Sequence, residues 1–391
     1  MKRNIYLDNA ATTPIAKEVL EAMQPYFMEK YGNASSTHSK GMEAKEALEK
    51  SRVIIAKSIN ARAEEIIFTS GGTEANNFAI KGLAFAHPEK KHLITTKIEH
   101  DCVMNSCKWL QTKGYDVTYL NVDKEGFVSP EDLEKAIRKD TLLFSCIHGN
   151  NEIGTIQDIE TLGKICRKHN VLFHIDACQS YTKTIIDVKK QNLDLVTLNA
   201  HKIHGPKGVG ALYIRNGITI TPLSHGGGHE RGLRSGTENI PGIVGFARAS
   251  QLMSRQDIEK MNKLRDYFIQ ELEKDIPNIK LNGPRKNRLC NNVNVSFVGA
   301  EGESIGAYLN INGIATSTGS ACSSHSLLPS HVLTSIGDSK EEIAGATRMT
   351  ISKYTTKEDI DYVLKILPDI IARLRKTSPL MKFIDKVQKN L

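Results

Sequence analysis

Short apolar runs rich in β-branched residues alternate with amphipathic segments between Glu64 and Arg215. The runs with the composition of buried strands are 64–70, 92–100, 116–122, 142–149, 171–180, 193–201 and 208–215, and the segments 73–87 and 159–170 have helical character. Such alternation is typical of an α/β fold in which helices cover both faces of a mostly parallel sheet. We therefore expect a seven-stranded sheet of this kind, with functional residues near the strand ends.

The pattern changes after the glycine-rich stretch at 226–236. A helical run from about Gly242 to Lys274 leads into a second group of elements, which includes an apolar strand at 291–299 and an amphipathic helix at 358–376. This group predicts a smaller α+β domain beside the large one.

We expect a large cofactor-binding domain at 14–255. A small domain, formed by 1–13 and 256–391, is expected to carry a mobile loop at about 317–331. No internal repeat or long linker separates the two parts, so we expect them to share a substantial interface. A cleft between them is the natural place for a site.

The composition is that of a soluble globular protein, because 40% of the 391 residues are hydrophobic and 25% are charged. No run approaches the roughly 20 apolar residues of a membrane span, and the first segment, MKRNIYLDNAATTP, is not an export signal. The net charge is +8, but the basic residues are dispersed among acids, which argues against direct nucleic-acid binding. The odd number of cysteines and the absence of a CxxC pair argue for a reducing compartment, so we expect a cytoplasmic protein without membrane association.

The ends of two successive strands carry a candidate cofactor site. The strand at 171–180 presents Asp176, and the next strand ends close to Lys202 in NAHKIHGPKG. A pyridoxal-phosphate (PLP) site needs a lysine for the aldehyde, a carboxylate for the pyridine nitrogen, a planar group for the ring face and donors for the phosphate. Lys202 and Asp176 fit the first two needs, and Gln179 could donate to the ring oxygen. The alternatives are a capping or ion-paired role for Asp176, and Lys207 as the reactive lysine, although Lys207 lies in a turn expected to be solvated.

A glycine-rich turn supplies donors for the phosphate. In TSGGTEANN, Gly72 and the glycine before it allow close backbone approach, and Thr73 opens a helix with free N–H groups. Asn199 and His201 add donors beside the candidate lysine. An ordinary helix cap at Thr73 requires the same geometry and stays open as an alternative.

The loop HGGGHERGLRSGT ends at Thr237 and contains two histidines four residues apart. Three glycines separate these histidines and no helix aligns their rings, which argues against a metal site. We expect a flexible loop that contacts an anion.

Cys322 lies in STGSACSSHS, among small polar residues that neither pack a core nor form a stable helix. Most of the other cysteines lie in or beside apolar or helical stretches, where a thiol usually serves as a small core residue. Accessible thiols react as thiolates, so we expect Cys322 to be a mobile, exposed nucleophile.

Motifs along nearly the whole chain resemble those of the cysteine desulfurases, in the NifS/IscS-like group of the class V aminotransferase superfamily. In order, these motifs are YLDNAATTP, GNASSTH, FTSGGTEANN, EH at 99–100, NNEIG, DACQS, HKIHGPKGVGALY, GGGHERGLRSGT, VNVSF and STGSACSS. The resemblance implies a fold-type I PLP enzyme with the aspartate aminotransferase-like fold. It also implies that Lys202 carries the cofactor, His100 stacks on its ring, Asp176 meets the pyridine nitrogen and Gln179 meets the ring oxygen.

The resemblance further implies how the phosphate and the substrate are held. Phosphate contacts would come from Thr73, from residues 199–201 and, across a homodimer interface, from Thr237. Asn151 and Arg348 would help to hold the cofactor and the substrate carboxylate.

In the implied reaction, L-cysteine displaces Lys202, the α-proton moves, and the Cys322 thiolate attacks the substrate sulfur. Alanine and a Cys322 persulfide result. In this family the sulfur commonly passes to an iron-sulfur scaffold or to a sulfur carrier for tRNA thiolation. No intrinsic metal is expected, although Cys322 is a candidate iron-sulfur ligand shared with a scaffold. The long cysteine loop, from Ser320 to about His331, resembles the group with broad acceptor reach.

Two positions depart from the family pattern. Asn199 stands where serine is common, and Ser317-Thr318-Gly319 stands where the loop commonly begins with two serines. Neither change removes a chemical group that the reaction needs. A selenocysteine lyase or another class V aminotransferase is the alternative, whereas the intact lysine, histidine and aspartate set argues against a non-catalytic assembly scaffold.

Overall fold

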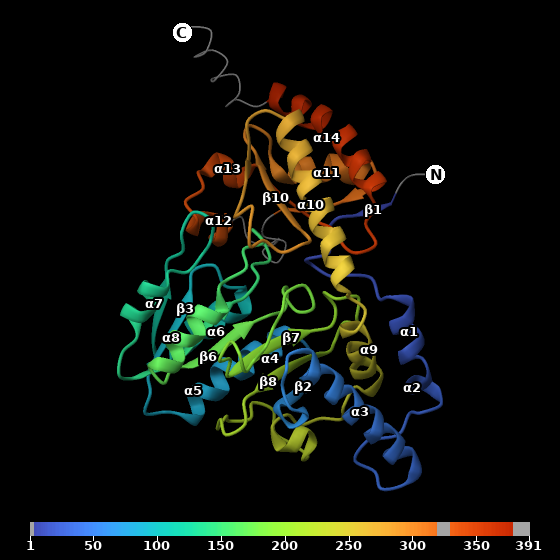
Figure 1. Cartoon of the computed structure of the whole chain (residues 1–391), viewed down its shortest axis with the longest axis vertical. Helices are drawn as coiled ribbons and strands as arrows, with labels where there is room; N and C mark the ends of the chain where they lie inside the picture. Colours follow the sequence, from blue (N-terminus) through green and yellow to red (C-terminus); the bar gives the residue numbers. More distant parts are fainter. Residues whose placement is uncertain (1–3, 319–328, 378–391) are drawn as a thin grey trace.

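The computed structural model describes residues 4–318 and 329–377. A seven-stranded sheet with the order β2-β8-β7-β6-β5-β3-β4 occupies the lower half of Figure 1. Its strands are β2 (Ile66–Thr69), β3 (His92–Thr96), β4 (Asp116–Leu120), β5 (Thr141–Ile147), β6 (Leu172–Asp176), β7 (Leu195–Asn199) and β8 (Gly210–Ile214). β8 runs antiparallel to both of its neighbours, and the other pairs are parallel. The predicted α/β fold with a mostly parallel seven-stranded sheet is confirmed.

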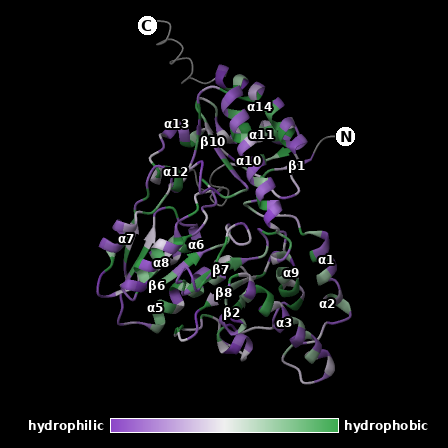
Figure 2. Ribbon diagram, viewed as in Figure 1, coloured by the Kyte–Doolittle hydropathy of each residue, from purple (hydrophilic) through white to green (hydrophobic). Residues whose placement is uncertain are grey.

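Both faces of this sheet are buried. Phe68 of β2 and Phe144 of β5 belong to one hydrophobic cluster, whereas their chain neighbours Ile67 and Leu143 belong to another. Successive side chains of a strand point to opposite faces of the sheet. When both faces are covered, consecutive residues of a strand are therefore apolar. Figure 2 shows hydrophobic residues gathered on these inner strands and hydrophilic residues on the outer helices.

Helices from separate parts of the chain cover the two faces. Apolar residues of α3 (Ser39–Ser58), α8 (Ile159–Lys168) and α9 (Ile240–Ser250) join one cluster, and those of α4 (Gly72–Asn77), α5 (Leu83–Ala86) and α6 (Asp101–Gln111) join the other. A π-helical turn, Phe78–Gly82, connects α4 to α5. The shorter helices of this half are α1 (Lys17–Met23), α2 (Pro25–Met28) and α7 (Pro130–Ala136).

A four-stranded antiparallel sheet with the order β12-β13-β10-β9 forms the upper half of Figure 1. Its strands are β9 (Ile279–Leu281), β10 (Asn292–Phe297), β12 (Ser317–Thr318) and β13 (Ala346–Thr350), and its helices are α10 (Arg255–Asp275), α11 (Gly302–Ile311), α12 (His331–Ser335), α13 (Lys340–Ala344) and α14 (Lys357–Thr377). The first strand, β1 (Ile5–Tyr6), pairs in parallel with β11 (Ile314–Ala315), so the start of the chain lies beside its later part. The proposed domain boundaries stay a prediction.

The helical run expected from Gly242 to Lys274 is wrong as a single element, because α9 ends at Ser250 and α10 begins at Arg255. Ser254 caps α10 by accepting from the backbone of Asp257, whose carboxylate accepts from the Ser254 backbone in return. This capping box fixes a new helix start, and the four residues before α10 turn the chain toward the smaller sheet.

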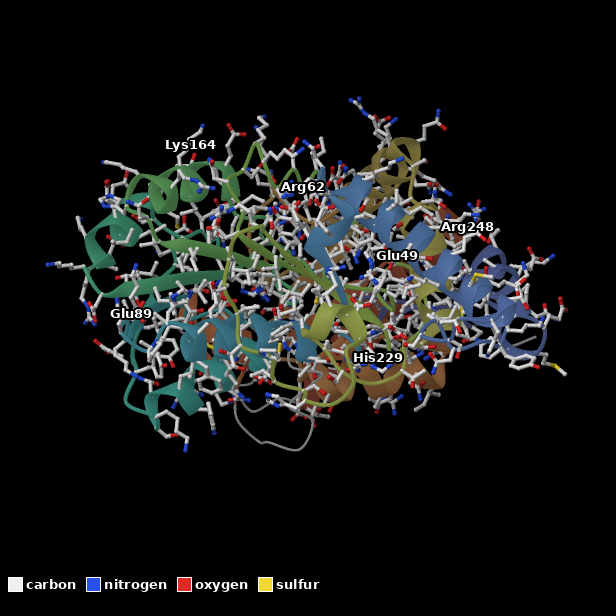
Figure 3. All side chains as sticks on the ribbon, turned by 90° about the horizontal axis from the view of Figure 1, so that it is seen from below. Glu49, Arg62, Glu89, Lys164, His229 and Arg248 are labelled. Atoms are coloured by element: carbon white, nitrogen blue, oxygen red, sulfur yellow. The ribbon has the colours of Figure 1, made fainter. Side chains whose placement is uncertain are left out.

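Charged side chains of both signs project around the large-sheet half, as Figure 3 shows for Arg62, Glu89, Lys164 and Arg248. Lys164 pairs with Glu160 on the same helix at 3.0 Å. No helix within 4–318 and 329–377 is both long and apolar enough to cross a membrane.

Candidate active site

A cavity of about 250 Å³ lies at the carboxyl ends of the central parallel strands. Asp176 is the last residue of β6, Asn199 the last of β7 and Ile147 the last of β5, and all three line it. The candidate residues that the fold brings together here are Gly72, Thr73, His100, Asn151, Asp176, Gln179, Asn199, His201, Lys202 and Arg348. Ligands of open α/β sheets bind at this edge, outside the carboxyl ends of the strands.

Two residues of the candidate set are not placed in this cavity. Thr237 is exposed and is not among the residues that line it. Cys322 lies outside the described residues.

Asp176 is buried and held by two hydrogen bonds. Its Oδ1 accepts from the backbone of Cys178 at 2.9 Å, and its Oδ2 accepts from Nδ2 of Asn76 at 2.7 Å. Burial by itself raises the pKa of a carboxyl, but the nearby His100, the Cys178 hydrogen bond and Lys202 outweigh it and bring the pKa below its usual value. The cavity therefore contains a fixed negative charge at neutral pH.

His100 stands at the N-terminus of α6 as its cap. Its Nδ1 accepts from the backbone of Cys102 at 3.2 Å and lies 3.1 Å from Sγ of the same residue. Burial and then the charge of Lys202 lower the pKa of the ring below its usual range. At neutral pH His100 thus offers the cavity a neutral aromatic face.

Lys202 lies in the loop after β7 and lines the same cavity as Asp176 and His100. Its rival Lys207 is exposed and lines a neighbouring hollow beside the segment 70–74. The placement favours Lys202 as the reactive lysine, because it alone of the two shares a cavity with the carboxylate.

The first residue of α4, Gly72, packs closely against Cys178, which also lines the cavity. A Cβ on Gly72 would lie 2.4 Å from Sγ of Cys178, so a larger residue there would displace its neighbours. Asn199 is 2% exposed, and its Oδ1 has no hydrogen-bond partner among the described residues. Burial and then the lysines Lys202, Lys207 and Lys183 lower the pKa of His201 to about 4, so its ring is neutral.

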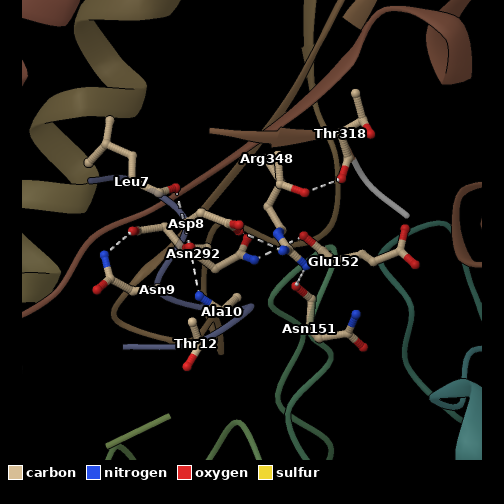
Figure 4. A network of polar contacts seen from close by, with 12 residues as sticks. Leu7, Asp8, Asn9, Ala10, Thr12, Asn151, Glu152, Asn292, Thr318 and Arg348 are labelled. Carbon is tan, nitrogen blue, oxygen red and sulfur yellow. Dashed lines mark hydrogen bonds and ion pairs between the residues drawn. The ribbon is translucent and has the colours of Figure 1, made fainter. Parts of the chain in front are cut away.

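Arg348 reaches the cavity from β13 of the smaller sheet (Figure 4). Its Nη1 donates to the carbonyl of Asn151 at 3.0 Å, and its Nη2 donates to Oδ1 of Asp8 at 2.9 Å. The guanidinium is buried, and its Nε has no partner among the described residues. The site therefore joins residues of both sheets and of the N-terminal segment.

The residues present fit PLP. The ionised Asp176 suits a protonated pyridine nitrogen, and the start of α4 at Gly72 and Thr73, which line the cavity, offers backbone N–H groups to an anion. Gln179 donates from Nε2 to the carbonyl of Ala10 at 2.8 Å, and its amide has a second N–H for a ring oxygen. The buried oxygens of Gln179 and Asn199 have no partner among the described residues, and each needs a donor such as a water molecule.

Sequence reasoning missed several residues that line the cavity, among them Ala10, Ala11, Asn76, Cys102 and Cys178. Asn76 follows Thr73 by three residues on the same helix, and this spacing could have indicated that both face the site. Ala10 carried no such signal, because its contact with Gln179 joins residues 169 apart in the sequence.

The fold and the site define a PLP-dependent enzyme of the aminotransferase type. The family model for class-V aminotransferases matches residues 5–363. The chain is 54% identical to cysteine desulfurase IscS of Dictyoglomus turgidum, over 97% of each chain, and 51% identical to that of Methanosarcina thermophila, over 96% of this chain and 94% of the relative. The chain belongs to the class-V aminotransferase family and, within it, to the cysteine desulfurases.

Two solved structures are similar along most of the chain. A NifS-like protein superposes with a TM-score of 0.89 at 40% identity, covering 94% of this chain and 99% of its own. SspA, solved in complex with cysteine, superposes with a TM-score of 0.82 at 40% identity, covering 90% of this chain and 100% of its own.

Proposed function

We propose that this enzyme moves the sulfur of L-cysteine onto its own Cys322, releases L-alanine, and hands the sulfur to an acceptor. The observation that carries the proposal is that the ionised Asp176, the neutral His100 and Lys202 line a single cavity. The identity to cysteine desulfurases over nearly the full chain supports it.

The cofactor would be held from all sides of this cavity. Asp176 would hold the pyridine nitrogen protonated, and His100 would cover the ring face. Thr73, Asn199 and His201 would contact the phosphate, together with the backbone at Gly72. When bound, PLP supplies the electron sink that makes the substrate α-carbon acidic.

The substrate would be oriented by its carboxylate. Arg348 is the cationic side chain that the smaller sheet contributes to the cavity, and guanidinium groups bind carboxylates in a fork geometry. Asn151 fixes that fork through its carbonyl, which accepts from Nη1. Asp8 neutralises part of the charge of Arg348, so the substrate would share the guanidinium with a resident carboxylate.

Two side chains of the cavity would move protons. Lys202, which lines the cavity, would take the proton from the substrate α-carbon. His100 has a lowered pKa and a neutral ring, so it can accept a proton from the substrate thiol or return one to the product.

Cys322 would complete the reaction as a thiolate. Its attack on the substrate sulfur forms an S–S bond and breaks the C–S bond at the substrate β-carbon, which takes up a proton to become the methyl group of alanine. Cys322 and its neighbours in the sequence lie outside the described residues.

The proposal includes a homodimer in which Thr237 contacts the phosphate of the partner subunit. Thr237 is exposed and does not line the cavity of its own chain. Arg234, in the same loop, donates from Nε to Glu74 of α4 at 2.9 Å and so fixes the base of the loop. Mixing Lys202→Ala with Thr237→Ala subunits should give heterodimers with one intact site, whereas two impaired sites would contradict the arrangement.

The acceptor would be an iron-sulfur scaffold or a sulfur carrier for tRNA thiolation, in the cytoplasm. Cys322 would then also be the residue that a scaffold could share as an iron-sulfur ligand. The two relatives described above carry the name cysteine desulfurase IscS, which supports a place in sulfur supply.

The direct test is to incubate the PLP-loaded protein with L-cysteine and a thiol reductant, and to measure alanine and sulfide. Both should appear in equal amounts. Cys322→Ser should make almost no alanine, because serine offers no thiolate to accept sulfur, and Ser324→Ala is the matched control in the same segment. Near-normal turnover by Cys322→Ser would remove Cys322 from its role.

The same assay separates the alternatives. A selenocysteine lyase would have a far higher kcat/KM on L-selenocysteine than on L-cysteine. Another class V aminotransferase would keep its activity in Cys322→Ser and would need an oxo-acid to turn over.

A further inference from the structure

Lys183 is a buried lysine directly behind the residues that line the cavity. Its Nζ donates to the carbonyl of Gln179 at 2.9 Å and to the carbonyl of Lys202 at 3.2 Å. The side chain is 7% exposed. It therefore joins the turn that follows β6 to the loop that follows β7.

Within the described part of the chain, Lys183 forms no ion pair with a carboxylate. Burial lowers the pKa of its ammonium group to about 8; Cys290 and, more weakly, Cys178 oppose the shift, and the charge of Lys202 adds to it. A buried cation without a counter-ion costs stability unless hydrogen bonds compensate. The two carbonyls of Gln179 and Lys202 supply that compensation for Lys183.

The backbone before Lys183 is strained. Thr182 has a φ of +62°, in the left-handed region that β-branched residues avoid, and its Oγ1 has no hydrogen-bond partner among the described residues. Backbone strain of this kind costs about 1–3 kcal/mol and persists where the surrounding structure imposes it. The turn thus holds an unfavourable conformation that directs the next side chain inward, between Gln179 and Lys202.

We infer that Lys183 is a positioning residue for the cofactor site: it clamps the carbonyls of Gln179 and Lys202 and so fixes the spacing of the two side chains that flank the cavity. This inference rests on the proposed function, because it assigns PLP to the cavity. Lys183 itself is not among the residues that line that cavity. It acts through the backbone of two residues that do.

The first test measures PLP affinity by titrating cofactor into the apo-protein and following the visible absorption band. Lys183→Met keeps the length of the side chain and removes the donors, and it should weaken PLP binding at least ten-fold. Lys189→Met, which removes an exposed lysine six residues away, should bind as the wild type does. Lys183→Gln keeps a donor without the charge and should lie between the two.

The second test separates positioning from stability. The unfolding temperature of apo Lys183→Met should be close to that of apo Lys189→Met, because removing the buried charge offsets the loss of two hydrogen bonds to carbonyls. A large loss of apo stability that accounts for the weaker binding would make Lys183 a structural residue and overturn the inference.

Two further outcomes are decisive. If Lys183→Met, or Lys183→Gln where the first variant does not fold, binds PLP as tightly as the wild type, the inference fails while the proposed function stands. If the wild type itself binds no PLP, the proposed function fails first.

Discussion

Asn76 donates through Nδ2 to Oδ2 of Asp176 at 2.7 Å, inside the cavity that both residues line. Asn76 is 0% exposed, and its own Oδ1 has no partner among the described residues. The amide therefore stabilises the charged form of the carboxylate and sets the direction of its free lone pairs.

We expect Asn76→Ala to weaken PLP binding by about ten- to a hundred-fold, because a hydrogen bond to a charged group contributes roughly 1.5–3 kcal/mol. Titration of the apo-protein with PLP measures the change. Asn105→Ala, on the exposed face of α6, is the control and should leave the affinity as it is. Equal affinities for Asn76→Ala and Asn105→Ala would show that Asp176 needs no such support.

The assignment of Lys202 as the reactive lysine and the alternative assignment of Lys207 predict different attachment points for the cofactor. Borohydride reduction of the PLP-loaded protein fixes the cofactor on the lysine that carries it, and mass spectrometry locates the added mass. We expect the label in wild type and Lys207→Ala, and none in Lys202→Ala. A label that survives Lys202→Ala and disappears in Lys207→Ala would reverse the assignment.

We expect Glu99 to make the stability of the protein depend on pH. It is fully buried, its Oε1 accepts from Oγ1 of Thr96 and from the backbone of Ile147, and burial raises its pKa from 4.5 to about 8. The folded protein holds this proton where the unfolded chain has lost it. The free energy of unfolding should therefore fall between pH 4.5 and about 8, by at most about 1.4 kcal/mol per pH unit.

The isosteric variant Glu99→Gln keeps the acceptor and removes the titration. Denaturant titration near both ends of this pH range measures its free energy of unfolding. This free energy should fall much less with rising pH than that of the wild type. Glu89→Gln replaces an exposed glutamate and should follow the wild-type curve. Parallel curves for wild type and Glu99→Gln would mean that Glu99 is charged in the folded state.

Thr182→Gly should stabilise the apo-protein by about 1 kcal/mol. Glycine adopts a positive φ freely, so the strain is released, and the greater chain entropy of glycine cancels part of the gain. Thr184→Gly, two residues on, has no positive φ to relieve and should destabilise the protein. Denaturant unfolding of both variants measures the difference, and a loss of stability in Thr182→Gly would show that its side chain compensates for the backbone.

Local patterns were sufficient to predict the large sheet. Its strands are short and mostly apolar, because the inner strands are covered on both faces, and helices follow β2, β3, β4 and β5. The break between α9 and α10 was missed although Ser254 and Asp257 have the spacing of a capping box. The helical pattern of apolar residues on both sides of this break concealed the capping-box signal.

The candidate site could be predicted where its residues follow a strand, as Asp176 and Lys202 do. The pairing of Asp8 with Arg348 could not, because it joins positions 340 apart and depends on how the two sheets meet. The burial of Lys183 could not be predicted either, because a lysine near a turn is usually solvated and nothing in the local sequence shows that this one is buried.

The pairing of β1 with β11, followed by the contacts of Asp8 and Ala10, has a consequence for the order of folding during translation. The ribosome makes Ile5 and Asp8 long before their partners Ile314 and Arg348. The large sheet can form on the nascent chain, but the cavity cannot close until most of the chain has been made. The cavity residues proposed to contact PLP lie between Gly72 and Lys202, so Arg348 would complete the substrate side of the cavity after the cofactor side has been made.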